Sequence, residues 1–145
     1  FGLLGTGSGG IVNGIAIGGL GIGAGKSAKG IMIGGMGPKK TLRMVAQYAD
    51  ACNFFEGAGL ERMQSALDTL KEHCERLGRD YDTIEKTSLG TVHLSGKDTV
   101  DDVIRRIKDL SEMGFTHTIF NMPDVYEIKP LETFGKEIIP AVTDL

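Results

Sequence analysis

Apolar residues follow two alternating patterns from Ile31 to the end of the chain. Short, dense apolar runs alternate with longer stretches in which apolar residues recur every three or four positions. The dense runs predict buried strands and the spaced stretches predict amphipathic helices. The four predicted strands cover residues 31–33, 51–55, 87–94 and 116–122. Because strands and helices alternate over short connections, the pattern indicates parallel strands covered by helices.

The helix predicted over residues 60–77 has the clearest period, with apolar residues at Leu60, Met63, Leu67, Leu70, Cys74 and Leu77. Gly78 is a typical residue for ending it. The first helix is expected to begin at Pro38, because proline suits the first helical turn. The last helix is expected to run from near Pro130 to Pro140.

Two further helix faces follow from the same spacing. The first helix is expected to place four residues on one face, namely Leu42, Val45, Tyr48 and Ala49. The third is expected to be capped by Asp98 or Thr99, to end at Gly114, and to turn a second set of side chains inward. That set is Val103, Ile104, Ile107, Leu110 and Met113.

Residues 1–30 differ from the rest in their glycine content. Twelve of the 22 glycines fall there, and no charged residue precedes Lys26. Residues 1–25 are long enough to span a membrane, but eleven glycines among them disfavour a stable apolar helix. We therefore expect a flexible or strand-like glycine-rich segment at 1–30, followed by an α/β part at 31–145.

Charge and cysteine content narrow the class of protein. The chain has 145 residues and a net charge of −3, which argues against a nucleic-acid-binding protein. Cys52 and Cys74 form no CxxC motif, so we expect a reduced, cytoplasmic protein. The three histidines lack metal-ligand spacing, and we expect no metal site.

Ligands in parallel α/β folds bind at the carboxyl ends of strands. The first predicted strand ends in Gly34, Gly35, Met36 and Gly37, and a helix follows. Bare main chain at a helix N-terminus favours an anion or the face of a flat cofactor. A plain glycine turn is the alternative.

Three polar residues near other strand ends are further candidates. Asn53 and Asn121 interrupt apolar strands, so each bonds to protein groups or points toward a ligand. His93 lies near the end of its predicted strand and is either a ligand contact or a structural hydrogen-bonding group. Neither cysteine has the histidine and acid context of a catalytic nucleophile.

Two stretches, IMIGGMGPKKTLRMVAQYADACNFF and LDTLKEHCERLGRDYDTIEKTS, resemble the C-terminal half of luciferase-like flavin- or deazaflavin-dependent oxidoreductases. The resemblance implies the last four strand–helix units of a (β/α)₈ TIM barrel. It also implies FMN or coenzyme F-420 (a deazaflavin) at the strand ends, with hydride transfer or monooxygenation of a small-molecule substrate. By motif, Gly34, Gly35, Met36 and Gly37 would approach the cofactor and Asn53 would line its site. His93 and Asn121 follow by topology.

The resemblance covers about four fifths of the chain, and the front half of the barrel is missing. A full barrel takes about 250 residues. We therefore expect an oxidoreductase-family polypeptide that is incomplete as a single chain, and pairing into a homo-oligomer would cover its open sheet. One alternative is a non-catalytic half barrel that binds a cofactor or serves assembly. Another is a small flavodoxin-like or phosphate-binding α/β domain in which residues 11–22 add a strand. Strand order separates these folds.

Overall fold

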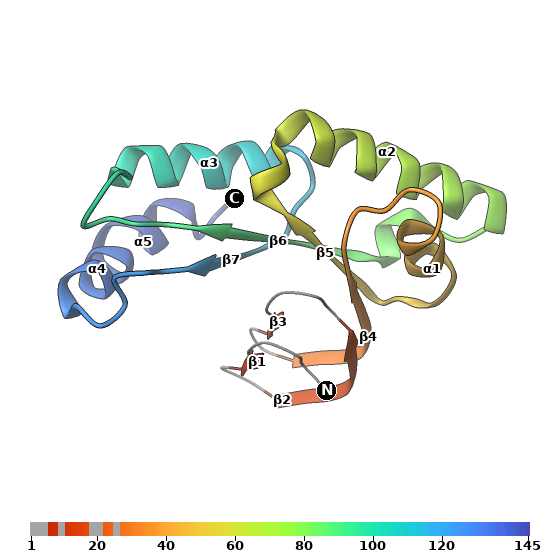
Figure 1. Cartoon of the computed structure of the whole chain (residues 1–145), viewed down its shortest axis with the longest axis horizontal. Coiled ribbons are helices and arrows are strands. Elements are labelled where there is room, and N and C mark those ends of the chain that lie inside the picture. The colour runs from red at the N-terminus through yellow and green to blue at the C-terminus, as the bar shows by residue number, and fades with distance from the viewer. Residues whose placement is uncertain (1–5, 9–10, 18–21, 25–26) are drawn as a thin grey trace.

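A five-stranded parallel sheet forms the centre of the molecule in a computed structural model, which describes residues 6–8, 11–17, 22–24 and 27–145 (Figure 1). The strand order is β2-β4-β5-β6-β7, and every neighbouring pair is parallel. The strands are β2 (Ile11–Ile17), β4 (Ser27–Gly34), β5 (Ala51–Phe55), β6 (Glu85–Thr91) and β7 (His117–Asn121). The consecutive order of β4 to β7 contains no switch point, so it is the order of a barrel segment and not of a flavodoxin-like sheet.

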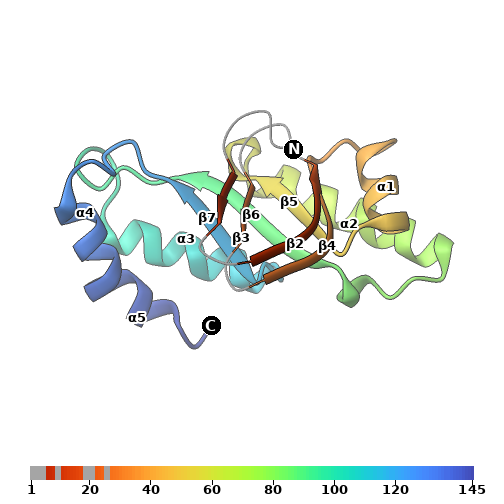
Figure 2. The same cartoon turned by 90° about the horizontal axis from the view of Figure 1, so that it is seen from below.

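Helices cover one face of this sheet. They are α1 (Thr41–Tyr48), α2 (Leu60–Leu77), α3 (Val100–Glu112), α4 (Ile128–Thr133) and α5 (Ile139–Val142). Short helical turns are η1 (Glu56–Ala58), η2 (Tyr81–Thr83) and η3 (Phe134–Ile138). Figures 1 and 2 place α2 and α3 on one side of strands β5 to β7, and the separate strands β1 and β3 on the other. We call the side away from α2 and α3 the inner face, because it would line the inside of a closed barrel.

The core lies between the sheet and its helices. Cys52 and Phe54 of β5 pack there against the apolar stripes of α1 and α2. The Phe54 ring meets the Phe115 ring edge to face, with centroids 5.3 Å apart. A second cluster joins Val92, Val103 and Ile138 beneath α3 and η3. These apolar stripes account for most of the expected helix faces, since burial of one stripe stabilises an amphipathic helix.

Some boundaries and faces differ from the sequence prediction. Helix α1 begins at Thr41, because Pro38 and the two lysines after it form a turn. Tyr48 is 58% exposed, while Ala46 is buried in its place. The last helical stretch continues through Pro140 to Val142, because this proline occupies the first turn of α5, where no helical N–H is required.

The N-terminal strands lie along the edge of the sheet. Strand β2 pairs with β4, which begins at Ser27 and not at Ile31 as expected. Two short strands, β1 (Thr6–Ser8) and β3 (Ile22–Ala24), form a separate parallel pair. Part of the candidate membrane segment at residues 1–25 lies outside the described residues. In the part that the structure describes, no helix has the length and apolar character needed to span a bilayer.

Candidate functional site

The strand register places several candidate residues in one row across the sheet. Gly34 is the partner of Asn53, and Asn53 is the partner of Thr87. Because side chains alternate between the faces of a strand and Cys52 and Phe54 point into the helix-covered core, Asn53 points to the inner face. The row Gly34, Asn53 and Thr87 therefore lies on the inner face, near the carboxyl ends of β4 and β5.

The glycine loop after β4 is held at both ends by main-chain hydrogen bonds. The Gly35 N–H donates to the Asn53 carbonyl (2.9 Å), and the Leu42 N–H donates to the Gly37 carbonyl (3.0 Å). Gly35 has φ +117°, a conformation that other residues rarely adopt. A Cβ at Gly37 would lie 2.9 Å from Thr41 Oγ1. Glycine is thus required by conformation at Gly35 and favoured by space at Gly37, while Met36 between them packs against the core and Gly37 is exposed.

Asn53 is buried and partly satisfied by protein. Its Oδ1 accepts a hydrogen bond from the Thr87 hydroxyl (2.8 Å), which also lies 3.4 Å from the Cys52 carbonyl. Among the described residues, none accepts a hydrogen bond from the Asn53 amide nitrogen. Thr87 therefore orients the Asn53 side chain through its oxygen, and the amide nitrogen is the group left to donate to a ligand.

His93 and Asn121 lie near one another but away from the glycine loop. Strand β6 ends at Thr91, three residues earlier than expected, so His93 belongs to the following loop. That loop folds on itself: the His93 N–H donates to Asp98 Oδ2 (2.7 Å), and a Cβ on Gly96 would lie 2.5 Å from His93 Nδ1. The exposed Asn121 ends β7 opposite Thr91, and its carbonyl accepts from the Val92 N–H (3.0 Å). The structure thus groups Gly34 with Asn53, and places His93 and Asn121 on the far side of β6.

An ion pair that the sequence prediction did not include holds the ends of β5 and β6 together. Glu56 follows β5 directly; its Oε1 accepts from the Ser88 hydroxyl (2.7 Å) and its Oε2 lies 3.0 Å from Arg106 Nε. Arg106 also donates to the Thr91 carbonyl (3.0 Å). Gly90 lies beneath the pair, where a Cβ would be 2.4 Å from Glu56 Oε2. The glycine inside a strand was the available signal, since it marks a close approach of other groups.

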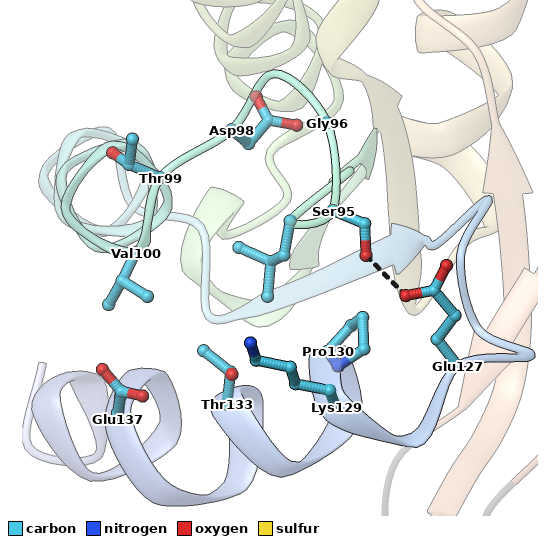
Figure 3. Close-up of a pocket in the computed structure, with 11 residues that line it drawn as sticks. Ser95, Gly96, Asp98, Thr99, Val100, Glu127, Lys129, Pro130, Thr133 and Glu137 are labelled. Carbon is cyan, nitrogen blue, oxygen red and sulfur yellow. Dashed lines mark hydrogen bonds between the residues drawn. The ribbon is translucent and has the colours of Figure 1, made fainter.

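A surface cavity of about 590 Å³ lies between the β6–α3 loop and the α4–η3 helical stretch (Figure 3). The Ser95 hydroxyl donates to Glu127 Oε2 across it (3.0 Å). Behind the loop, buried Asp124 accepts a hydrogen bond from the Ser95 N–H (2.9 Å), and this bond lowers the pKa of the Asp124 carboxyl. A second cavity of about 580 Å³ lies between α1 and α2 and is lined by Lys39, Arg43 and His73 among others. Gly34, Gly35 and Asn53 line neither of these two cavities.

The cysteines and acidic groups add no reactive centre to the described part of the chain. Cys52 is fully buried, and burial raises the pKa of its thiol to about 12. Burial also raises the pKa of Cys74. Among the described residues, no three His, Cys, Asp or Glu side chains are grouped so that they could hold a metal ion. At the carboxyl ends of β4 and β5 the described groups are the main chain of the glycine loop, the Asn53 amide and the paired Glu56 carboxylate.

Comparison by sequence finds no matching family model and no matching curated protein. Comparison by structure finds the coenzyme F-420-dependent tetrahydromethanopterin reductase of Methanopyrus kandleri, with TM-score 0.60 and 15% identity over 80% of this chain and 53% of that one. An F-420-dependent secondary alcohol dehydrogenase, solved with an F-420–acetone adduct, gives TM-score 0.59 and 18% identity over 79% and 49%. A riboflavin lyase, solved with modified FMN and riboflavin, gives TM-score 0.62 and 10% identity over 84% of this chain and 45% of that one.

These similarities concern the fold. The chain spans about half the length of each of the three solved proteins. Together with the consecutive parallel strands, they confirm the predicted fold class: an α/β chain with the fold of part of a (β/α)₈ barrel.

Proposed function

We propose that this chain is a luciferase-like, oxidoreductase-type half barrel that binds FMN or coenzyme F-420 at the carboxyl ends of β4 and β5. The observation that carries the proposal is the conformation of Gly35. A glycine with φ +117° at a strand end, bonded to the next strand, leaves main chain open to a flat ring or a phosphate. Enzymes that share the fold are named for F-420, and one was solved with modified FMN.

The residues present have simple roles in this proposal. The main chain of residues 34–37 approaches the cofactor, and Asn53 supplies an amide donor oriented by Thr87. Lys39 and Lys40, exposed directly after the loop, attract the negatively charged part of either cofactor. The bound cofactor supplies the hydride chemistry, while the protein positions it. His93 and Asn121 remain proposed contacts on the β6–β7 side of the same face.

The isolated chain is proposed to lack full activity. It spans about half of its structural neighbours, and the site of a complete barrel is built from the loops of all eight strands. Thr91 and Asn121 are exposed on the inner face, as expected for a sheet whose opposite half is missing. We therefore expect weak cofactor binding without turnover.

A titration of the purified chain with FMN and with F-420, followed by fluorescence, tests this proposal. We expect saturable, weak binding of at least one of them and no reduction of the bound cofactor by candidate hydride donors. Gly35→Ala should weaken binding, whereas Gly78→Ala should leave it unchanged. Gly78 also has positive φ (+65°) but ends α2, so it controls for backbone strain. Tight binding with turnover by a proven monomer would refute the incompleteness, and equal effects of the two substitutions would refute the site.

The second candidate function is a non-catalytic half barrel that serves cofactor binding or assembly. The pairing of β2 along the edge of β4 favours it, because that edge is where a preceding barrel strand would pair. A stable homo-oligomer that binds cofactor and stays inactive when supplied with hydride donors would support this candidate over the first.

A further inference from the structure

A sixteen-residue repeat connects the glycine-rich N-terminal residues to β4. Residues 14–21 read GIAIGGLG and residues 30–37 read GIMIGGMG, so six of the eight positions are identical. The glycines at 5, 7 and 9 recur at 21, 23 and 25, again sixteen residues later. Internal self-similarity at a fixed period is typical of stacked repeat architectures.

The structure pairs the two copies in the same register. In the β2–β4 pair, Ile11 is the partner of Ser27 and Ile17 is the partner of Ile33. In the β1–β3 pair, Thr6 is the partner of Ile22. Every one of these partners is sixteen residues away along the chain. The sequence repeat and the strand register thus agree, and the described strands form two stacked layers of a parallel arrangement, β1 and β2 on β3 and β4.

The outer edge of β2 has no paired strand among the described residues. In a parallel sheet the main-chain groups of alternate residues face opposite edges. The Ile31 carbonyl accepts from the Asp50 N–H beside β5, so Gly30 and Met32 face β2, and their register partners Gly14 and Ala16 face the open edge. The edge that β2 leaves open is therefore a copy, in sequence and in register, of the edge that it covers. An uncapped solenoid coil and an open parallel edge both accept a further strand.

We propose that the open edge of β2 is a docking surface for a parallel strand with the same sixteen-residue pattern, in which Gly-Ile-x-Ile-Gly-Gly-x-Gly is the central feature. Main-chain hydrogen bonds provide the affinity, and the isoleucine pattern sets the register. The occupant is a peptide segment with a free edge. A second whole copy cannot repeat the β2–β4 contact, because the edge of its β2 that would be needed is already paired with its own β4. The proposal is independent of the cofactor assignment.

The test uses the complete chain, labelled with ¹⁵N, and a synthetic peptide of residues 21–37 with a nitroxide at its N-terminus. We expect saturable binding and paramagnetic broadening of the amide signals of β2, with those of β7 unaffected. Strand β7 ends the opposite side of the sheet and serves as the internal control. A peptide carrying Ile33→Pro loses a main-chain donor on the edge that would face β2, and we expect it to bind about tenfold more weakly. All substitutions are in the peptide, so the fold of the chain is not altered.

Four results would overturn the proposal. They are the absence of peptide binding, equal binding of a scrambled peptide, broadening at β7 in place of β2, and an unchanged affinity of the proline peptide. Self-association of the chain through β2 that excludes the peptide would overturn it as well, because the occupant would then be a second copy.

Discussion

Thr87 and Asn53 are register partners on adjacent parallel strands, and the Thr87 hydroxyl donates a 2.8 Å hydrogen bond to the Asn53 amide oxygen. Both side chains are buried on the inner face of the sheet. This bond fixes which end of the amide faces Thr87. The orientation of the Asn53 amide beside the glycine loop is thereby set by the next strand, which links the candidate site to the packing of the sheet.

Removing the Thr87 hydroxyl should destabilise the fold. In Thr87→Val the shape is kept but the buried Asn53 oxygen loses its donor, so we expect the free energy of unfolding to fall by about 1–3 kcal/mol. Urea denaturation measures this change. Thr91→Val, at an exposed position of the same strand, should change it by less than about 0.5 kcal/mol. Equal losses in the two variants would show that the bond has no particular role.

Gly90 is expected to tolerate no larger residue. A Cβ there would lie 2.4 Å from Glu56 Oε2 and 2.8 Å from Arg106 Nη2, so Gly90→Ala must displace the ion pair. We expect a loss of about 1–3 kcal/mol in thermal or urea unfolding. Gly135→Ala is the matched control, because nothing lies within 4 Å of a Cβ in that helical position. The Gly135→Ala control should leave the free energy of unfolding unchanged or raise it by up to about 1 kcal/mol. An unchanged stability of the Gly90→Ala variant would contradict the described packing.

The N-terminus of α3 should show a pH-dependent cap. Thr99 and Asp102 form a reciprocal capping box, and the hydrogen bonds from Thr99 lower the pKa of the Asp102 carboxyl. Because the pKa of Asp102 is lower in the folded than in the unfolded protein, its carboxylate stabilises the fold at pH values above the ordinary pKa of aspartate. This stabilisation is lost as the pH falls through the pKa that Asp102 has in the folded protein. Thr99→Ala should cost about 1 kcal/mol near neutral pH.

The cost of Thr99→Ala should shrink as the pH falls below the ordinary aspartate range. Parallel urea titrations of the two proteins at several pH values measure this gap. Lys97→Ala, an exposed change in the preceding loop, provides the reference at each pH. A gap that stays constant down to strongly acidic pH would exclude a role for the Asp102 carboxylate in the cap.

Cys52 should be chemically silent in the folded chain. Its thiol is fully buried and its pKa is raised to about 12, so almost no thiolate exists near neutral pH. We expect alkylation by iodoacetamide to proceed at the rate of unfolding, and to become fast in denaturant. Peptide mapping by mass spectrometry distinguishes Cys52 from Cys74. Rapid modification of Cys52 in native buffer would contradict its burial.

The sequence was most informative where a long apolar period met clear end signals. Helix α2 matches the prediction over residues 60–77. Its apolar residues recur with helical spacing over about five turns, and Gly78 marks its end. Strand β5 matches residues 51–55 for a similar reason. Strand β6 was predicted to end three residues too late, because Leu94 is as apolar as the strand itself. The turn that ends β6 depends on Asp98 bonding back to His93, a contact that periodicity does not reveal.

The candidate site was predictable in part. The glycine loop and Asn53 were found from their places at strand ends, and the register brings them together. The Glu56–Arg106 pair was not found, because it joins residues 50 positions apart whose proximity depends on how α3 packs over β6. The sixteen-residue repeat was available in the sequence but hidden by glycine abundance, which makes isolated matches uninformative. The pairing of β2 with β4 at the same offset distinguishes the repeat from chance matches.

The location of a bound cofactor is the most direct test of the proposed function. ¹H–¹⁵N correlation spectra of the chain, recorded during titration with FMN and with F-420, report which amides contact the ligand. The proposal predicts that the largest shifts fall on Gly34, Gly35, Met36 and Gly37 and on the Asn53 side-chain amide, for at least one of the two cofactors. Shifts confined to the cavity beside Ser95, or no shifts with either cofactor, would contradict it.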